Sequence, residues 1–350
     1  MTKAAVRLGA LIAAAMVWAS GGAASAAGAG THGCATPPPT RCARADCAIE
    51  SPGNAVEPRS GRRYFLDYPC DLKPGEKVLF ILNLHGAGLS GDWQRRYFPA
   101  AALKDKYRLV VATPTAAQSF VIDEGSPPAR LWQAGADDAY LRDIVREVVS
   151  RFGRSNIRAL WLAGHSYGGM TANRVVCDDF FKDTADGWLS LSGGRIGPAP
   201  VPPGFGPAHP PSHGPGLLRP QDPHPGAAIT PTCDFSYIFE TGEREIVTLP
   251  TTSPWADRYG CRSRVRREDV VDDEPGLVDR LRPGPEDPAR GRAARPGRAE
   301  IFVWSGCRRG QLVADVVRLD KGHTEGLEPN VTEKLVQLMA AAPGGKLRRR

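Results

Sequence analysis

A serine in this 350-residue chain stands where nucleophilic catalysis could use it. Ser166 lies in a Gly-His-Ser-Tyr-Gly run at 164–168, which follows an apolar run at 158–163 and opens an amphipathic one. A serine between glycines at a strand-to-helix turn is typical of a nucleophile elbow, because glycines let the strand and the helix approach closely. We therefore expect Ser166 to present its hydroxyl beyond the carboxyl edge of a sheet.

A serine hydroxyl needs an imidazole to accept its proton, and in this arrangement the histidine follows the serine in the chain. Four histidines do so, His209, His213, His224 and His323. The first three lie in a Pro-rich stretch that fixes no position, whereas His323 directly follows an apolar run at 313–319. That run predicts a strand ending at the same sheet edge as Ser166, so we predict that His323 is the base.

A carboxylate that orients the imidazole should end a strand between the serine and the histidine. The segment 235–247 offers a strand, a turn and then acidic residues, of which Glu245 and Glu243 are candidates. Asp257 is a third candidate. We predict Glu245 as the acid and keep the other two as alternatives.

Acyl transfer also needs N–H donors for an oxyanion. The backbone N–H of Tyr167, the residue after the predicted nucleophile, is one candidate donor. Ala87 is the second, because it lies in Leu84-His85-Gly86-Ala87-Gly88, whose small residues allow a turn directly after an apolar run. The chain shows no phosphate loop, dinucleotide fingerprint or zinc-protease motif, so we expect neither a cofactor nor a metal.

Apolar runs and amphipathic runs alternate along the chain from Tyr64. Strands are predicted at 78–83, 109–112, 157–163, 188–191, 237–239 and 313–319. Helices are predicted at 138–152, 169–178 and 330–341. This alternation predicts an α/β fold with a mainly parallel central sheet and helices on both faces.

Two stretches interrupt the pattern. Residues 196–232 are rich in Pro and Gly, which excludes a helix or a central strand. Residues 262–299 are rich in Arg, Asp and Glu with little apolar content to bury. We interpret both as surface excursions from one domain.

The N-terminus has the pattern of a secretory signal peptide at 1–26, with Lys3 and Arg7, an apolar stretch and an Ala-Ser-Ala cleavage site. No further stretch reaches membrane-spanning length, so we expect a secreted or periplasmic protein without stable membrane insertion. The formal charge is +7, but the signal peptide and the basic tail at 344–350 hold most of the excess. The body is therefore close to neutral, and we expect no nucleic-acid partner.

All eight cysteines follow the predicted cleavage site, and an even number suits disulfides in an oxidising compartment. No C-x-x-C pair is present, and the histidines do not fall at zinc-ligand spacings around the cysteines. We expect structural bridges, with the connectivity open among 105 possibilities.

Motifs along the chain resemble those of the secreted α/β-hydrolases that include polyhydroxybutyrate depolymerases, feruloyl esterases and acetylxylan esterases. The resemblance covers about 64–192 and from 233 to the C-terminal helix. Its markers are Leu84-His85-Gly86, Asp137-Asp138, the run from Gly164 to Met170 with Ala172-Asn173-Arg174, Cys177, Tyr259-Gly260-Cys261, Ser305-Gly306-Cys307 and Gly322-His323-Thr324.

The resemblance implies the α/β-hydrolase fold, with Ser166 as nucleophile and His323 as base. It also implies a Cys261–Cys307 disulfide near the histidine loop and a Cys177–Cys233 pair. The chain departs from the family at the acid turn, where Glu245 stands in the place of the usual aspartate.

These observations predict a signal peptide at 1–26, a Cys/Pro-rich arm at 27–56, one hydrolase domain at 57–343 and the tail. The predicted function is a secreted serine esterase that acts on polyester, feruloyl or acetyl sugar esters, or short-chain esters. The alternatives are an inactive binding protein of the same fold and a serine peptidase of related fold. The expected partner is the ester substrate.

Overall fold

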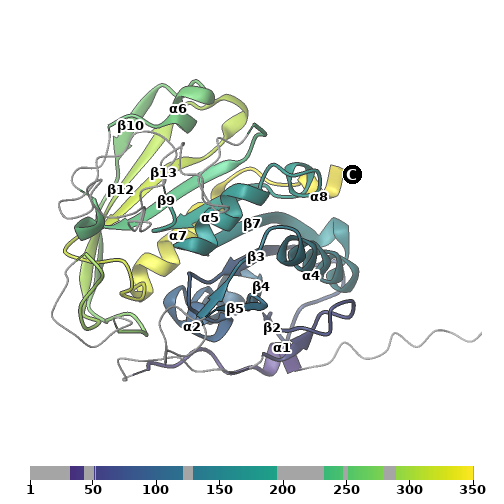
Figure 1. The fold of residues 1–350 in the computed structure, drawn as a ribbon. Helices are drawn as coiled ribbons and strands as arrows, with labels where there is room; N and C mark the ends of the chain where they lie inside the picture. The colour runs from purple at the N-terminus through teal and green to yellow at the C-terminus, as the bar shows by residue number, and fades with distance from the viewer. Residues whose placement is uncertain are drawn as a thin grey trace, which may run out of the picture. The chain divides into compact units, whose positions relative to one another are not determined.

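A mixed eleven-stranded sheet runs through the protein (Figure 1). The computed structural model describes residues 32–42, 51, 53–120, 129–194, 232–246, 251–279 and 289–349, which belong to one compact unit beginning at Thr31. The strand order is β1-β2-β4-β3-β7-β8-β9-β13-β12-β10, and β11 pairs with β12. A separate two-stranded ribbon is formed by β5 and β6.

The strands are β1 (Ala55–Val56), β2 (Arg63–Asp67), β3 (Val78–Leu84), β4 (Leu109–Pro114), β5 (Gln118–Phe120), β6 (Ala129–Leu131), β7 (Ile157–His165), β8 (Gly187–Leu191), β9 (Ser236–Gly242), β10 (Ser263–Arg266), β11 (Val270–Asp272), β12 (Gly297–Ser305) and β13 (Val313–Arg318). The helices are α1 (His32–Ala35), α2 (Gly91–Tyr97), α3 (Lys104–Tyr107), α4 (Ala136–Phe152), α5 (Tyr167–Val175), α6 (Pro254–Arg258), α7 (Pro329–Ala341) and α8 (Lys346–Arg349).

Six parallel strands, β4, β3, β7, β8, β9 and β13, form the centre of the sheet. They are the six strands that the apolar runs predict, each shifted by only a few residues at its ends. Because they are parallel, their carboxyl ends lie along one edge of the sheet. On the two sides, β2 pairs antiparallel with β4 and β12 pairs antiparallel with β13.

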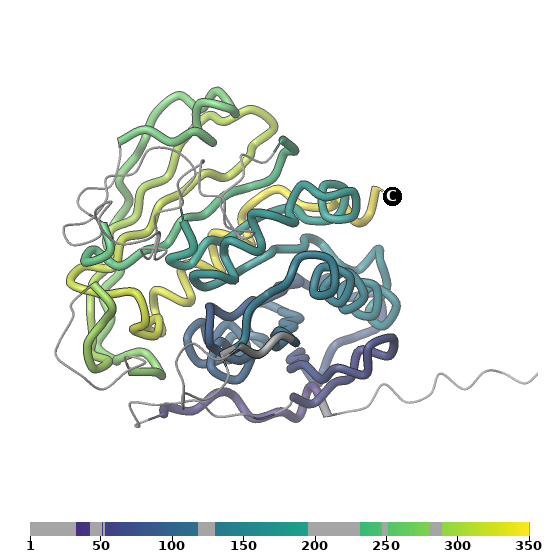
Figure 2. Tube along the Cα trace, in the orientation of Figure 1, coloured from purple at the N-terminus to yellow at the C-terminus, as the bar shows by residue number. Residues whose placement is uncertain are grey.

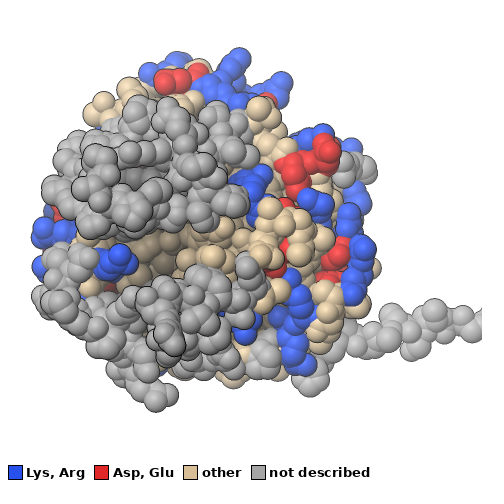
Figure 3. Space-filling view, viewed as in Figure 1, with Lys and Arg blue, Asp and Glu red and all other residues tan. Residues whose placement is uncertain are grey.

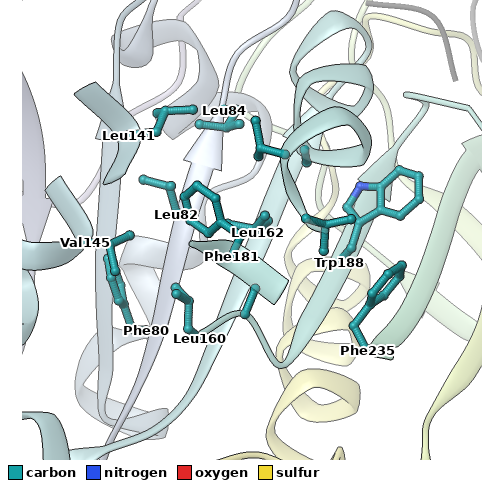
Figure 4. Close-up of a cluster of buried hydrophobic side chains, with 14 of the residues drawn as sticks. Phe80, Leu82, Leu84, Leu141, Val145, Leu160, Leu162, Phe181, Trp188 and Phe235 are labelled. Carbon is teal, nitrogen blue, oxygen red and sulfur yellow. The ribbon is translucent and has the colours of Figure 1, made fainter. Parts of the chain in front are cut away.

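Both faces of the sheet are buried. Side chains of alternate strand residues point to opposite faces, and the apolar residues separate into two clusters accordingly. Figure 4 shows one cluster, in which Phe80 and Leu82 of β3 pack with Leu160 and Leu162 of β7 and with Trp188 of β8. Near-continuous apolar strands are what a parallel sheet buried on both faces requires.

Helices cover both faces, as predicted. Leu141 and Val145 of α4 belong to the same cluster as Phe80 and Leu82, together with Met170 of α5. The opposite cluster holds Trp93 of α2 and Leu335 of α7. The three predicted helices are therefore confirmed, whereas α2 and the short helices were not predicted.

The prediction that 262–299 is a surface excursion is wrong for much of that stretch. Strands β10 and β11 both pair antiparallel with β12 and extend the sheet beyond β13. An edge strand gains its stability from backbone pairing and needs few apolar residues, so composition concealed it. The other predicted excursion, 196–232, lies outside the described residues apart from Thr232.

The basic tail, which the sequence analysis separates from the hydrolase domain, is packed against the sheet. Helix α8, the yellow turn at the C-terminus in Figure 2, contacts β7. Leu347 is only 2% exposed, and the Lys346 ammonium donates a hydrogen bond to the Lys182 carbonyl at 2.9 Å. Burial lowers the pKa of the Lys346 ammonium below its ordinary value.

Disulfides join Cys34 to Cys70, Cys177 to Cys233 and Cys261 to Cys307. The last two pairs are those implied by the family resemblance, and they are confirmed. Their expected location is wrong in one case: Cys307 follows β12 beside the start of β13, at the sheet edge opposite to His323. This bridge therefore stabilises the antiparallel extension instead of the histidine loop.

The N-terminal arm is described in part. Its α1 is tied to the end of β2 by the Cys34–Cys70 disulfide, and Cys42 forms an isolated β-bridge with Val278. The predicted signal peptide at 1–26 lies outside the described residues. Within the described ranges, no helix combines the length and the apolar character needed to cross a membrane.

Candidate functional site

Ser166 occupies the sharp turn between β7 and α5. Its backbone has φ 49° and ψ −117°, a left-handed conformation that is strained for a residue with a side chain. Its N–H donates to the Leu191 carbonyl at 2.8 Å at the end of β8, and its carbonyl accepts from the Met170 N–H in α5. The neighbouring strand and the helix therefore hold the turn from both sides.

The glycines around Ser166 are required by close backbone contacts. A Cβ on Gly164 would lie 2.3 Å from the carbonyl carbon of Gly168, and a Cβ on Gly168 would lie 2.4 Å from the Leu84 oxygen. Only glycine allows β7, α5 and the end of β3 to approach so closely. The geometry is that of the nucleophile elbow predicted from the sequence.

Glu245 and His323 form a hydrogen-bonded pair. His323 Nδ1 lies 2.7 Å from Glu245 Oε2, and the glutamate side chain is fully buried. The other carboxylate oxygen accepts from the Ser192 hydroxyl at 2.7 Å and from the Gly242 N–H at 2.8 Å. Three donors thus fix the carboxylate, which orients the imidazole ring with Nε2 as its free edge.

Hydrogen bonds and an ion pair join the two loops that carry Glu245 and His323. The Glu243 carboxylate accepts from the Asp320 N–H at 2.8 Å, and the Arg244 N–H donates to the Lys321 carbonyl at 2.9 Å. The Arg244 guanidinium also pairs with the Asp320 carboxylate at 2.6 Å. A Cβ on Gly242 would lie 2.4 Å from the Lys321 oxygen, so the two loops are in direct backbone contact.

His165 connects the serine turn to the histidine loop. Its Nε2 lies 2.9 Å from the His323 carbonyl, and the two rings have centroids 4.7 Å apart. A carbonyl only accepts, so Nε2 carries a proton. Burial lowers the pKa of His165 well below its ordinary value. Ser166 and His323 therefore belong to adjoining segments, although no hydrogen bond joins the Ser166 hydroxyl to His323 in the described part of the chain.

The loop that contains Ala87 lies against the serine turn. The Leu84 and His85 oxygens approach Gly168, and a Cβ on Gly86 would lie 2.7 Å from His165 Nδ1. Ala87 is exposed, and among the described residues its N–H has no hydrogen-bond partner. Tyr167 begins α5, so its N–H lies at the helix end where N–H groups point outward along the axis.

His85 holds the Ala87 loop in place. Its Nε2 accepts from the Ala116 N–H at 2.9 Å, which leaves Nδ1 to donate to the Gly86 carbonyl at 2.7 Å. The ring is thus a neutral imidazole with both nitrogens used. Burial lowers the pKa of His85 to about 4, so it stays neutral at physiological pH.

A buried group of charges, which the sequence analysis missed, lies behind the histidine loop. Arg318 ends β13 and pairs with Glu240 at 2.6 Å, and its Nη2 lies 3.5 Å from the Tyr97 hydroxyl oxygen. Burial raises the pKa of Glu240 to about 7, while the Arg318 charge opposes the rise. Lys321 pairs with Glu328 at 2.5 Å. The sequence feature that could have revealed this group is Arg318, a charged residue at the end of an apolar run.

The alternative site residues lie elsewhere or have other partners. Glu243 bonds the Asp320 N–H instead of the imidazole. Asp257 is exposed on α6, and the nearby Tyr259 bonds Phe235 at the start of β9, the opposite end from Glu245. His209, His213 and His224 lie outside the described residues. Across the described ranges, no group of three or more His, Cys, Asp or Glu is arranged to hold a metal ion.

Strand order and the serine turn define the class of fold. The order β1-β2-β4-β3-β7-β8-β9-β13, with β2 antiparallel and the central strands parallel, is that of the α/β-hydrolase fold. The turn after β7 and the chain order of serine, acid and histidine agree with it. The protein has an α/β-hydrolase fold, which β10, β11 and β12 extend at one side.

The chain matches no protein-family model and no curated protein sequence. Among solved structures it is similar to the acetyl xylan esterase from Aspergillus awamori, with 11% identity and a TM-score of 0.44 over 79% of this chain and 93% of that one. The native form of the protein called pOPH gives 18% identity and a TM-score of 0.32 over 44% of this chain and 56% of pOPH.

A soluble variant of monoglyceride lipase from Saccharomyces cerevisiae gives 18% identity and a TM-score of 0.27. That match covers 37% of this chain and 39% of the lipase, so this chain spans well under half of its length. Identities this low do not carry an activity from one protein to another. The fold assignment therefore rests on the strand order and the serine turn.

Proposed function

We propose that the protein is a secreted serine esterase that hydrolyses carboxylic esters through an acyl-enzyme. The observation that carries the proposal is the Glu245–His323 pair at 2.7 Å, beside the strained turn that holds Ser166. A buried acid, an oriented imidazole and a serine at a sharp turn are the groups that acyl transfer by serine requires.

In the first half-reaction His323 Nε2 removes the proton of the Ser166 hydroxyl as its oxygen attacks the ester carbonyl carbon. The carbonyl π electrons move to the oxygen, and the Ala87 and Tyr167 N–H groups stabilise the resulting oxyanion. Glu245 stabilises the imidazolium without taking its proton. Collapse of the intermediate breaks the bond to the alcohol oxygen, which takes the proton from His323.

In the second half-reaction the neutral His323 takes a proton from water, whose oxygen attacks the acyl carbon. The same N–H groups hold the second oxyanion, and its collapse releases the carboxylic acid and returns the proton to Ser166. Each proton removed is thus returned within one cycle. The chemistry uses only groups of the chain, the ester and one water molecule.

The central test is Ser166→Ala in purified protein, with 4-nitrophenyl butanoate as substrate. We expect kcat to fall by a factor on the order of 10³ or more. Ser150→Ala, at an exposed position on α4, is the matched control and should keep wild-type activity. A fluorophosphonate should label the wild type and the control, and not Ser166→Ala. Hydrolysis that survives in Ser166→Ala would show that this mechanism is wrong.

Substrate preference and export need separate measurements. A panel of 4-nitrophenyl esters of graded chain length, feruloyl and acetyl sugar esters and polyhydroxybutyrate would rank the acyl and alcohol groups. Peptides offered beside the esters test the peptidase alternative, and a flat response to the whole panel would favour the binding protein.

Export is tested by fractionating cells and sequencing the mature N-terminus, expected near Ala27.

A further inference from the structure

A cavity of about 450 Å³ lies beside the Ala87 loop. Arg62 and Arg63 line it from the start of β2, and Arg130 lines it from β6. Ser90, which precedes α2, and Thr115 and Ala116, which follow β4, complete this part of the wall. Because β2 runs antiparallel to β4, its start lies at the carboxyl end of β4. The cavity is therefore at the same sheet edge as Ser166.

Two hydrogen bonds connect the cavity wall to the predicted oxyanion loop. The Ala116 N–H donates to His85 Nε2 at 2.9 Å, and the Gly88 N–H donates to the Arg130 carbonyl at 2.9 Å. Gly88 is the neighbour of Ala87, so the predicted oxyanion donor is one position from a residue that bonds the cavity wall and three positions from Ser90, which lines it. A substrate held at Ala87 could extend part of its chain into this space.

The charge on the cavity wall is positive and only partly neutralised. Asp137 lies 2.7 Å from Arg62 and compensates its charge. In the part of the chain that the structure describes, no carboxylate lies within ion-pair distance of Arg63 or Arg130. Their side chains donate to carbonyl oxygens instead, Arg63 to Gly53 at 3.0 Å and Arg130 to Ala116 at 3.3 Å. These bonds orient the two guanidinium groups, and their charge has no carboxylate partner among the described residues.

Resting on the proposed esterase function, we propose that this cavity binds a carboxylate carried by the ester substrate. A guanidinium presents parallel N–H donors that match the two oxygens of a carboxylate. Hydroxyl groups of Ser90 and Thr115 add polar surface to the wall. The inferred substrate class is therefore an ester with a free carboxylate elsewhere on the molecule, such as a half-ester of a diacid.

The test compares two esters of equal chain length, mono-4-nitrophenyl adipate, which ends in a carboxylate, and 4-nitrophenyl hexanoate. The measured quantity is the ratio of kcat/KM for the anionic ester to that for the neutral ester. In Arg63→Gln/Arg130→Gln we expect this ratio to fall by about tenfold, since a charge-assisted pair contributes at least that much. Arg266→Gln, on the far strand β10, is the matched control and should leave the ratio unchanged.

The alcohol side is tested in the same way with the butanoyl esters of 4-hydroxybenzoate and of 4-hydroxybenzamide. A fall in the ratio on either pair supports the inference and shows which side of the ester enters the cavity. If the ratio for both pairs is the same in the wild type and the double variant, the inference is wrong. Circular dichroism of Arg63→Gln/Arg130→Gln checks its folding, and Arg63→Glu alone should lower the ratio further.

Failure of the esterase proposal would be recognised separately. If the wild type hydrolyses none of these esters, the proposed function is wrong. The carboxylate site in the cavity is then tested by a binding measurement that needs no hydrolysis. Calorimetry would then measure monoethyl adipate binding to Ser166→Ala, with and without the two Arg→Gln changes. Binding that weakens about tenfold on removal of the arginines supports a carboxylate site, whereas absent or unchanged binding excludes it.

Discussion

Glu245 contacts the His323 imidazole from a short turn that directs its side chain back toward the sheet. The residue ends a single 3₁₀ turn directly after β9, and the Gly242 N–H at the start of that turn donates to its carboxylate. The turn folds the longer side chain back toward the sheet, so that Oε2 meets His323 Nδ1. The Gly242 N–H thus holds the longer glutamate side chain at hydrogen-bond distance from the imidazole.

We predict that Glu245→Gln lowers kcat by a factor on the order of 10³, because an amide neither stabilises the imidazolium nor selects the required tautomer. Glu243→Gln, two residues away, is the matched control and should lose less than tenfold. Steady-state hydrolysis of 4-nitrophenyl butanoate by both variants gives the comparison. Equal losses in the two variants would remove Glu245 from its proposed role.

The buried neutral histidines make the folded state sensitive to acid. The pKa of His85 is about 4 in the folded protein, below its ordinary value of 6.5, because burial disfavours the charged ring. Below pH 6.5 the unfolded chain therefore binds a proton that the folded state does not. The stabilisation is complete above about pH 6.5 and is lost as the pH falls toward 4.

We predict that the wild type loses about 2 kcal/mol more unfolding free energy between pH 7 and pH 5 than His85→Gln. The glutamine amide can still donate to the Gly86 carbonyl and accept from the Ala116 N–H. Urea unfolding at the two pH values measures the difference. Parallel losses in the two proteins would mean that His85 does not titrate as its burial implies.

Sequence alone located Ser166, His323 and Glu245 as candidates because each follows an apolar run that predicts a strand. The partners of these residues were not predictable. Ser192 bonds Glu245, and His165 bonds the His323 carbonyl, but such contacts join segments that only the folded chain brings together. Arg318 was missed for the same reason, since its counter-charge on Glu240 comes from a neighbouring strand.

Among the elements, the central strands and the long helices were predictable and the peripheral ones were not. The parallel strands are buried on both faces and read as continuous apolar runs. Strand β10, in contrast, has a half-exposed Arg-rich sequence that backbone pairing with β12 converts into a strand. Because backbone pairing does not depend on particular side chains, the amino-acid composition of such a segment does not predict a strand.

The Cys177–Cys233 disulfide ties the segment after α5 to the segment before β9. It closes a loop with a sequence separation of 56, for which the chain-entropy model gives about 4 kcal/mol of stabilisation. We predict that Cys177→Ser/Cys233→Ser lowers the unfolding free energy by roughly 2–4 kcal/mol. Urea unfolding of the double variant and the wild type measures the loss. A change below about 0.5 kcal/mol would contradict the prediction.

At the scale of the whole molecule, the C-terminal turn is part of the core. On the face shown in Figure 3, Lys and Arg side chains are spread out with Asp and Glu among them and do not gather into one patch. The basic end of the chain is fixed by Leu347, which belongs to the same hydrophobic cluster as Phe80 and Trp188.

We predict that Leu347→Ala lowers the unfolding free energy by roughly 2–4 kcal/mol, because it leaves a cavity beside β7. Arg348→Ala, at the exposed next position, is the control and should change it by less than about 0.5 kcal/mol. Thermal and urea unfolding of the two variants measure the effect. If Leu347→Ala behaves like Arg348→Ala, the C-terminal turn does not contribute to the core.

The two ends of the sheet have a consequence for how the protein behaves at high concentration. A long, flat, apolar edge strand would pair with a second molecule and begin an aggregate. Here one end of the sheet is β1, which has only two residues, and the other consists of β10, which carries Arg264 and Arg266, and the three-residue β11. The Arg264 guanidinium lies 3.7 Å over the Phe302 ring and covers it. Charged side chains on an edge strand oppose pairing with a second sheet, so we expect these arginines to disfavour association of two molecules through β10.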